Sequence, residues 1–243
     1  METPEHAVKD AVTISTPDSS SPTVIADAVQ EALKIAIVGQ KGGVGKSTLS
    51  RTLAVEAVLN GFNTKIADLD HLQGTSIHWR ERREDSKIAP DIPVGVFSEL
   101  EDALSLAKDL DLLILDTPGG EEKWRRKHHP ILAKTADLIV IPSKSSLDDL
   151  YASIQMVFDF EKAGMPKHKI VIALSRMSTK TAEKEAREYC AENDVNVLPG
   201  CLYEQRAYEK ALDRGNGLTE INIATLKESA DKLIQALVDK VSE

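Results

Sequence analysis

A regular alternation of short apolar runs and longer amphipathic stretches begins at Lys34 and continues to the end of the chain. The apolar runs predict strands, which we place at 34–38, 64–67, 94–97, 112–115, 137–141, 169–174 and 195–198. Helical spacing of apolar residues predicts helices at 47–60, 99–108, 147–162, 180–192, 205–213 and 220–241. Continuous apolar strands alternating with helices are typical of a sheet buried on both faces. We therefore predict an α/β fold with a single doubly wound, mainly parallel sheet and helices on both faces.

The size and charge of the chain exclude several classes of protein. Its 243 residues include 39 acidic and 30 basic residues, for a formal net charge of -9. This balance argues against a surface that binds nucleic acid throughout, although it leaves room for a local basic patch. No stretch approaches the roughly 20 apolar residues of a membrane span. Cys190 and Cys201 match no zinc or redox spacing. We expect a cytoplasmic protein with no membrane partner.

Composition also divides the chain into two parts. Residues 1–33 are rich in Ser, Thr, Pro and acidic residues, and this composition predicts a disordered N-terminal tail. Residues 34–243 have the alternating pattern and form the predicted domain.

A glycine-rich segment follows the first predicted strand and opens the first predicted helix. Residues 39–48 read Gly-Gln-Lys-Gly-Gly-Val-Gly-Lys-Ser-Thr. Glycines allow the backbone to wrap around phosphate oxygens, and the helix N-terminus adds its positive dipole end. In such a loop Lys46 would neutralise the charge of the β- and γ-phosphates, and Ser47 would place its hydroxyl on Mg²⁺. The segment therefore predicts a phosphate-binding loop.

The loop differs from the ordinary Walker A pattern, because Gln40 stands where that pattern has glycine and Lys41 is an additional lysine. It resembles the deviant Walker A motif of the ParA/MinD family of ATPases, closest to the small plasmid-type ParA partition proteins, over about 34–243. The resemblance implies a P-loop NTPase that binds ATP and Mg²⁺ and forms an ATP-dependent homodimer. Lys41 would reach the nucleotide of the second subunit. The implied nucleotide-binding residues in the loop are Lys41, Gly42, Gly43, Val44, Gly45, Lys46, Ser47 and Thr48.

Two carboxylates follow predicted strands. Asp70 lies 24 residues after Lys46, where the resemblance implies the aspartate that positions or activates the attacking water. The family's Pro-Gln sequence after this aspartate is replaced here by His71-Leu72, and we assign Gln73 no role. Asp116 ends an apolar strand in a Walker B-like segment, so we expect it in the Mg²⁺ shell.

Weaker signals lie in the rest of the chain. Arg176 and Pro199 fall in segments that the resemblance implies contact the nucleotide base. The basic run 123–129 is equally consistent with a DNA contact and with a solvated helix face. We expect the segment 79–83 to be a surface helix, and the last helix to pack on the sheet because acidic residues dilute its lysines.

The resemblance implies a ParA-type ATPase with weak intrinsic turnover. It would bind DNA non-specifically, associate with the nucleoid and segregate a plasmid or other mobile DNA, with a ParB-like centromere-binding partner stimulating hydrolysis. The alternative is a MinD-like ATPase that positions a protein cargo or a membrane-associated complex. An iron–sulfur reductase with the same loop is disfavoured, because Cys190 and Cys201 lie too far along the chain.

Overall fold

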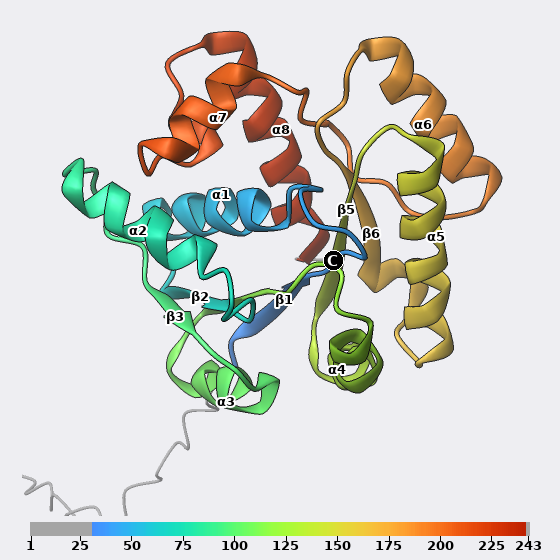
Figure 1. The fold of residues 1–243 in the computed structure, drawn as a ribbon, viewed down its shortest axis with the longest axis horizontal. Helices are drawn as coiled ribbons and strands as arrows, with labels where there is room; N and C mark the ends of the chain where they lie inside the picture. Colours follow the sequence, from blue (N-terminus) through green and yellow to red (C-terminus); the bar gives the residue numbers. More distant parts are fainter. Residues whose placement is uncertain (1–30, 242–243) are drawn as a thin grey trace, which may run out of the picture.

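The computed structural model describes residues 31–241, which form one parallel sheet with helices on both faces (Figure 1). The six strands lie in the order β3-β2-β4-β1-β5-β6. All five strand pairs are parallel. In chain order the strands are β1 Leu33–Ile37, β2 Thr64–Asp68, β3 Val94–Val96, β4 Leu112–Asp116, β5 Leu138–Ser143 and β6 Ile170–Leu174. The predicted fold class is confirmed.

The helices divide between the two faces of the sheet, and each group covers its own apolar core (Figure 1). One core lies under α1 Lys46–Leu59, α2 Thr75–Asp85, α7 Arg206–Asp213 and α8 Ala224–Val241. The other lies under α3 Leu100–Leu104, α4 Glu122–Thr135, α5 Leu147–Lys162 and α6 Lys180–Glu192. Alternate residues of each central strand enter opposite cores, which explains why these strands are apolar throughout. Within residues 31–241, no helix is both long and apolar enough to cross a membrane.

Several expected elements differ from the structure. The strand expected at 195–198 is not formed; Val197 makes only an isolated bridge with Ile172. The helix expected at 99–108 is α3 followed by a 3₁₀ helix, Ser105–Asp109. The helix expected at 220–241 begins at Ala224, because the 3₁₀ helix Leu218–Glu220 precedes it.

The segment 79–83 is also not the surface helix we expected. It lies in α2, where Trp79 is fully buried and Arg83 is 1% exposed. The charged residues of the segment gave no sign of this, because only the tertiary structure shows that Arg83 is paired with Glu220, whose side chain is 15% exposed. Most of the expected tail lies outside the described residues, and Leu33 already belongs to β1.

The topology brings the ends of three strands together. Asp116 at the end of β4 is in register with Asp68 of β2 on one side and with Ile37 of β1 on the other. The glycine-rich loop leaves β1 at the same edge and enters α1. Ligands of doubly wound sheets bind at the carboxyl edge of the strands, so the fold gathers the predicted loop and carboxylates there.

Candidate functional site

The glycine-rich loop adopts a conformation that requires glycine at two positions. Gly43 and Gly45 have φ angles of 69° and 105°. A Cβ atom on Gly45 would lie 2.4 Å from the Ser175 hydroxyl oxygen. Ser175 is the residue after β6, and its hydroxyl donates a hydrogen bond to the carbonyl oxygen of Val44 at 3.0 Å. The residue at the end of β6 therefore helps to hold the loop in this shape.

A cavity of about 450 Å³ lies beside this loop. Its lining includes six of the predicted loop residues: Gly42, Gly43, Gly45, Lys46, Ser47 and Thr48. Asp70 and Arg176 line it as well, together with Tyr208 of α7. The volume falls in the range of small-molecule sites, roughly 300–1,000 Å³. The tertiary structure thus brings together the loop, the β2 end and the segment after β6.

Lys46 lies at the centre of the site and is only 8% exposed. Its Nζ atom donates to the carbonyl oxygen of Lys41 at 3.4 Å. Burial lowers the pKa of Lys46, and the carboxylates of Asp116 and Asp70 oppose this shift by favouring the charged ammonium. An anionic ligand in the cavity would favour the charged form further, so Lys46 is suited to bind phosphate.

Two buried carboxylates lie behind the loop. Asp68 is fully buried and accepts hydrogen bonds from the backbone N–H groups of Asp70 and Ser76, both at 3.0 Å. Burial, aided by the nearby Asp116, raises the pKa of Asp68 to about 6. Burial also raises the pKa of Asp116, whereas Arg51 and Lys46 oppose that shift. Burial therefore disfavours the ionised form of both carboxyls, and a bound cation would stabilise that form.

One atom of this group fits a cation shell directly. Asp116 Oδ2 accepts from the Ser76 hydroxyl at 3.1 Å, but Oδ1 is buried and has no hydrogen-bond partner among the described residues. Ser47 lines the cavity, its hydroxyl lies near the Asp116 carboxylate, and it accepts a hydrogen bond from Thr75 at 3.4 Å. Carboxylate and hydroxyl oxygens are the ligands that Mg²⁺ prefers. The donor set therefore fits Mg²⁺ held by Ser47 and Asp116.

Lys41 points away from the cavity. Its side chain is 47% exposed, and Nζ forms an ion pair of 2.8 Å with Asp149 in the first turn of α5. Val44 also belongs to the loop. Its side chain is buried, and the residue does not line the cavity. The additional lysine, Lys41, is therefore not among the residues that line the cavity.

The two residues expected near the base are separated in space. Arg176 lines the nucleotide-sized cavity, donates to the Gly43 carbonyl oxygen at 3.2 Å and forms ion pairs with Glu204 and Glu209. Pro199 lines a different cavity of about 530 Å³ between β6 and α8. The structure therefore does not bring Pro199 to the phosphate loop. Tyr203 lines the same cavity as Arg176, and no motif in the sequence pointed to it.

The geometry agrees with the family comparison. Residues 35–219 match the sequence model of the CobQ/CobB/MinD/ParA nucleotide binding domain. The chain belongs to this family. Members of the ParA/MinD family are ATPases, and we assign the chain the same activity, with ATP as substrate and Mg²⁺ as cofactor.

Individual relatives in the family have different cellular roles. The chain is 27% identical over 217 residues to maintenance of carboxysome distribution protein A of Halothiobacillus neapolitanus, covering 86% of this chain and 97% of the relative. It is 24% identical over 229 residues to protein ParA of Rhizobium radiobacter, with the same coverage. The fold is similar to that of the septum site-determining protein MinD of Pyrococcus horikoshii complexed with Mg-ADP, with a TM-score of 0.66, 18% identity and coverage of 87% and 97%.

Sequence reasoning missed two buried polar residues of this ParA/MinD-type site. Arg51 in α1 is 7% exposed and donates to the Ser76 hydroxyl at 3.2 Å, while Ser76 donates to Asp116. A charged residue within the apolar pattern of 47–60 was the available signal for Arg51. Ser76 gave no signal, since serine is common on helix surfaces. Gln73, to which we assigned no role, lines the cavity.

Proposed function

We propose that the chain is a ParA-type ATPase that dimerises on Mg-ATP and binds DNA without sequence preference. It would associate with the nucleoid and segregate a plasmid or other mobile DNA, with a ParB-like centromere-binding partner stimulating hydrolysis. The observation that best supports this proposal is the position of Lys41, which belongs to the phosphate loop but lies outside the cavity and pairs with Asp149. A lysine in this position can act on the nucleotide of a second subunit.

The residues of one subunit then have separate roles. Lys46 and the loop N–H groups hold the β- and γ-phosphates, and Asp70 in the cavity wall orients the attacking water. When bound by Ser47 and Asp116, Mg²⁺ neutralises phosphate charge. Lys41 must leave Asp149 before it can reach a second subunit. Intrinsic turnover is therefore weak, because the transition-state charge is not fully compensated until the dimer forms.

Replacing Lys41 with alanine tests whether this lysine acts on the nucleotide of the second subunit. We expect partner-stimulated ATP hydrolysis to be abolished, while Asp149→Ala retains hydrolysis because it removes only the partner of Lys41 within the subunit. Asp70→Ala should bind ATP and remain a dimer, because ATP is not hydrolysed when the attacking water is no longer oriented. Phosphate release and size-exclusion chromatography measure both effects. Full activity of Lys41→Ala would rule out its role across the dimer, and normal turnover of Asp70→Ala would remove Asp70 from the mechanism.

One surface of the described structure suits a DNA backbone. Arg206, Lys210 and Arg214 lie four residues apart on α7 and its C-terminal end, are exposed, and form no ion pair within residues 31–241. In contrast, the basic run on α4 is largely engaged: Arg126 pairs with Glu122 and Lys127 with Glu99. We therefore propose that Arg206, Lys210 and Arg214 contact the DNA phosphates. They lie beside the nucleotide cavity, which α7 also lines.

Binding to random-sequence duplex DNA tests this assignment at one fixed low salt concentration, with ATP, with ADP and without nucleotide. We expect binding only with ATP. The triple variant Arg206→Ala, Lys210→Ala, Arg214→Ala should bind at least about tenfold more weakly and with a shallower salt dependence.

A matched control removes the same charge from the opposite edge of the sheet. Lys108, Lys134 and Lys162 are exposed and lie in the last turns of their helices, and replacing all three with alanine should leave DNA affinity within about twofold of the wild type. Equal losses in the two triple variants would contradict the α7 assignment. Dimerisation on ATP without DNA binding would contradict the DNA-carrier function.

The similarity to a carboxysome distribution protein favours a second candidate, an ATPase that positions a protein cargo or a membrane-associated complex. A membrane-directed version requires a basic amphipathic helix. In α8, Glu228, Asp231 and Asp239 alternate with lysines, and the apolar face is buried at Leu233 and Leu237. We expect no co-sedimentation with anionic liposomes in the presence of ATP. Sedimentation together with failure to bind DNA would favour the membrane-directed alternative.

A further inference from the structure

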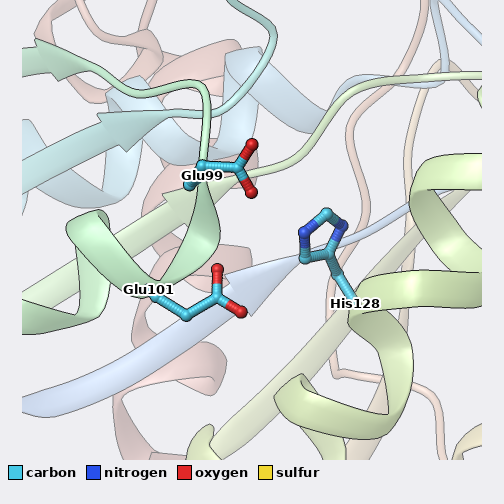
Figure 2. A group of neighbouring side chains, drawn as sticks. All are labelled: Glu99, Glu101 and His128. Atoms are coloured by element: carbon cyan, nitrogen blue, oxygen red, sulfur yellow. The ribbon is translucent and has the colours of Figure 1, made fainter.

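A group of potential metal ligands lies outside the nucleotide cavity, between α3 and α4. Glu99 immediately precedes α3, Glu101 is in its first turn, and His128 is on α4. One ligand atom from each lies within 4.8 Å of the others, and Figure 2 shows the three side chains converging on one point. None of the three lines the nucleotide cavity, so the group is separate from the proposed Mg²⁺ site.

The His128 ring is oriented as a metal ligand would be. It is 2% exposed, and its Nδ1 atom lies 2.9 Å from the carbonyl oxygen of Trp124. A carbonyl oxygen can only accept a hydrogen bond, so Nδ1 bears the proton and Nε2 of the neutral ring has a free lone pair. The ring of Trp124, with its centroid 4.5 Å away, packs against the imidazole and limits its rotation.

The same Nε2 atom is buried and has no hydrogen-bond partner among the described residues. A buried polar atom without a partner costs roughly 1–3 kcal/mol, so such atoms need an explanation. The two carboxylates beside it supply negative charge, yet neither forms a hydrogen bond with this atom. A cation shared by the three groups would satisfy all of them.

We propose that Glu99, Glu101 and His128 bind a divalent transition-metal cation of the Zn²⁺ type. An imidazole nitrogen with two carboxylates favours Zn²⁺ over Mg²⁺ and Ca²⁺, which prefer shells made entirely of oxygen. Histidine ligands in metalloproteins commonly donate their second N–H to a backbone carbonyl, as His128 does to Trp124. Three protein ligands leave one position of a tetrahedral site for water.

Binding requires only small movements of the two exposed residues. Tetrahedral Zn²⁺ with bonds of about 2.0–2.1 Å holds its ligand atoms about 3.3 Å apart, closer than the present upper separation of 4.8 Å. Glu99 must exchange its ion pair with Lys127, at 2.7 Å, for the cation. Both side chains of this pair are more than half exposed, so the exchange costs little.

The site would link α3 to the helix that follows the Walker B turn. Asp116 ends β4, and α4 begins six residues later at Glu122. A bound cation would therefore restrain α4 relative to the edge of the sheet. This inference rests on the ligand geometry alone and is independent of the proposed DNA function.

Calorimetric titration of the full, nucleotide-free chain with ZnCl₂ tests the site. We expect one Zn²⁺ bound through this group, with affinity at least about tenfold weaker in Glu101→Gln and in Glu99→Gln. Both glutamates are exposed, so these variants should fold, whereas substitution of the buried His128 would mix folding with binding. Glu81→Gln is the matched control: it changes an exposed glutamate paired with His78 at 3.0 Å and should leave the affinity unchanged.

A spectroscopic measurement identifies the ligand atom. In a long-range ¹H–¹⁵N spectrum of the histidines, His128 should show a proton on Nδ1, and Zn²⁺ should shift its Nε2 resonance. Mg²⁺ at the same concentration should leave that resonance in place. Equal affinity in Glu101→Gln, Glu99→Gln and the control would overturn the proposal. So would an unchanged His128 Nε2 resonance at saturating Zn²⁺, or the absence of binding heat.

Discussion

The two ends of α2 each contact a cluster of buried charge, and the clusters differ in how completely they are satisfied. At the start of the helix, Ser76 bonds to both Asp68 and Asp116. Near its end, Arg83 forms a bidentate ion pair with Glu220, with N–O distances of 2.6 and 2.8 Å. Both clusters link α2 to distant parts of the chain.

The cluster at the end of α2 is fully paired. Arg83 donates to the carbonyl oxygens of Pro90 and Gly215 in addition to Glu220. Gly215 is needed there, because its φ angle is +86° and a Cβ atom would lie 2.3 Å from the Arg83 backbone nitrogen. Each of the three guanidinium nitrogens thus has an acceptor, so this cluster holds the fold together and has no need of a ligand.

The cluster at the start of α2 is incomplete. Asp116 Oδ1 has no partner among the described residues, and the pKa values of Asp68 and Asp116 are raised, in both cases mainly by burial. Perturbed carboxylates beside a cavity are typical of functional sites. A buried charged residue stabilises the fold when its partners lie in the protein, and one without a partner beside a cavity is suited to bind a ligand.

The largest expected effect comes from breaking the paired cluster. Glu220→Ala should lower the free energy of unfolding by about 3–5 kcal/mol, because it leaves the Arg83 charge buried without its partner. Chemical denaturation measures the change. Arg80→Ala is the control: its bidentate pair with Asp91 is exposed, and its loss should cost no more than about 1 kcal/mol. Similar losses in both variants would contradict the distinction between buried and exposed pairs.

The incomplete cluster should make stability depend on pH. The pKa of Asp68 is raised from 3.8 to about 6, so the folded state binds the proton more tightly than the unfolded state. Its contribution to stability is therefore present below about pH 4 and is lost as the pH rises through 6. The loss is about 3 kcal/mol. Denaturant titrations at pH 4 and pH 7 should show a smaller difference in Asp68→Asn than in the wild type; equal differences would exclude Asp68 as the cause.

Binding of a ligand at the incomplete cluster, at the start of α2, should have the smallest effect of the three on the free energy of unfolding. Mg-ATP at 100 times its dissociation constant should raise the free energy of unfolding by about 2.7 kcal/mol. Asp116→Asn should lose the part that depends on Mg²⁺. The increment should be the same in Glu220→Ala, because the two clusters share no hydrogen-bond partner. A smaller increment in that variant would show that α2 couples its two ends.

The phosphate loop and its carboxylates were predicted because their signals are local. The order of strand, glycines, Lys46 and helix is contiguous, and the cavity lining confirms that six of these loop residues lie together. Asp70 was placed by the family resemblance, because it lies 24 residues after Lys46 in the sequence, and it lines the same cavity. The roles of these residues in catalysis remain predictions.

Other parts could not be predicted because they depend on residues far apart in the chain. Arg83 and Glu220 are 137 positions apart, and neither has a neighbour in sequence that indicates the pair. Pro199 was expected beside the base, yet the chain after β6 places it in another cavity. The approach of Glu99 and Glu101 to His128 likewise needed the packing of α3 and α4 against the sheet.

The sequence by itself determined the α/β class, the phosphate loop and the carboxylate that ends β4, because backbone conformation and strand burial follow from neighbouring residues. Tertiary structure decided which charges are paired. Whether Arg83 is a surface residue or a buried anchor, and whether Asp116 has a free oxygen, depends on which side chains the folded sheet brings within hydrogen-bond distance. Burial raises the energetic cost of each unpaired charge, so the same packing that stabilises one end of α2 leaves the other suited to bind a ligand.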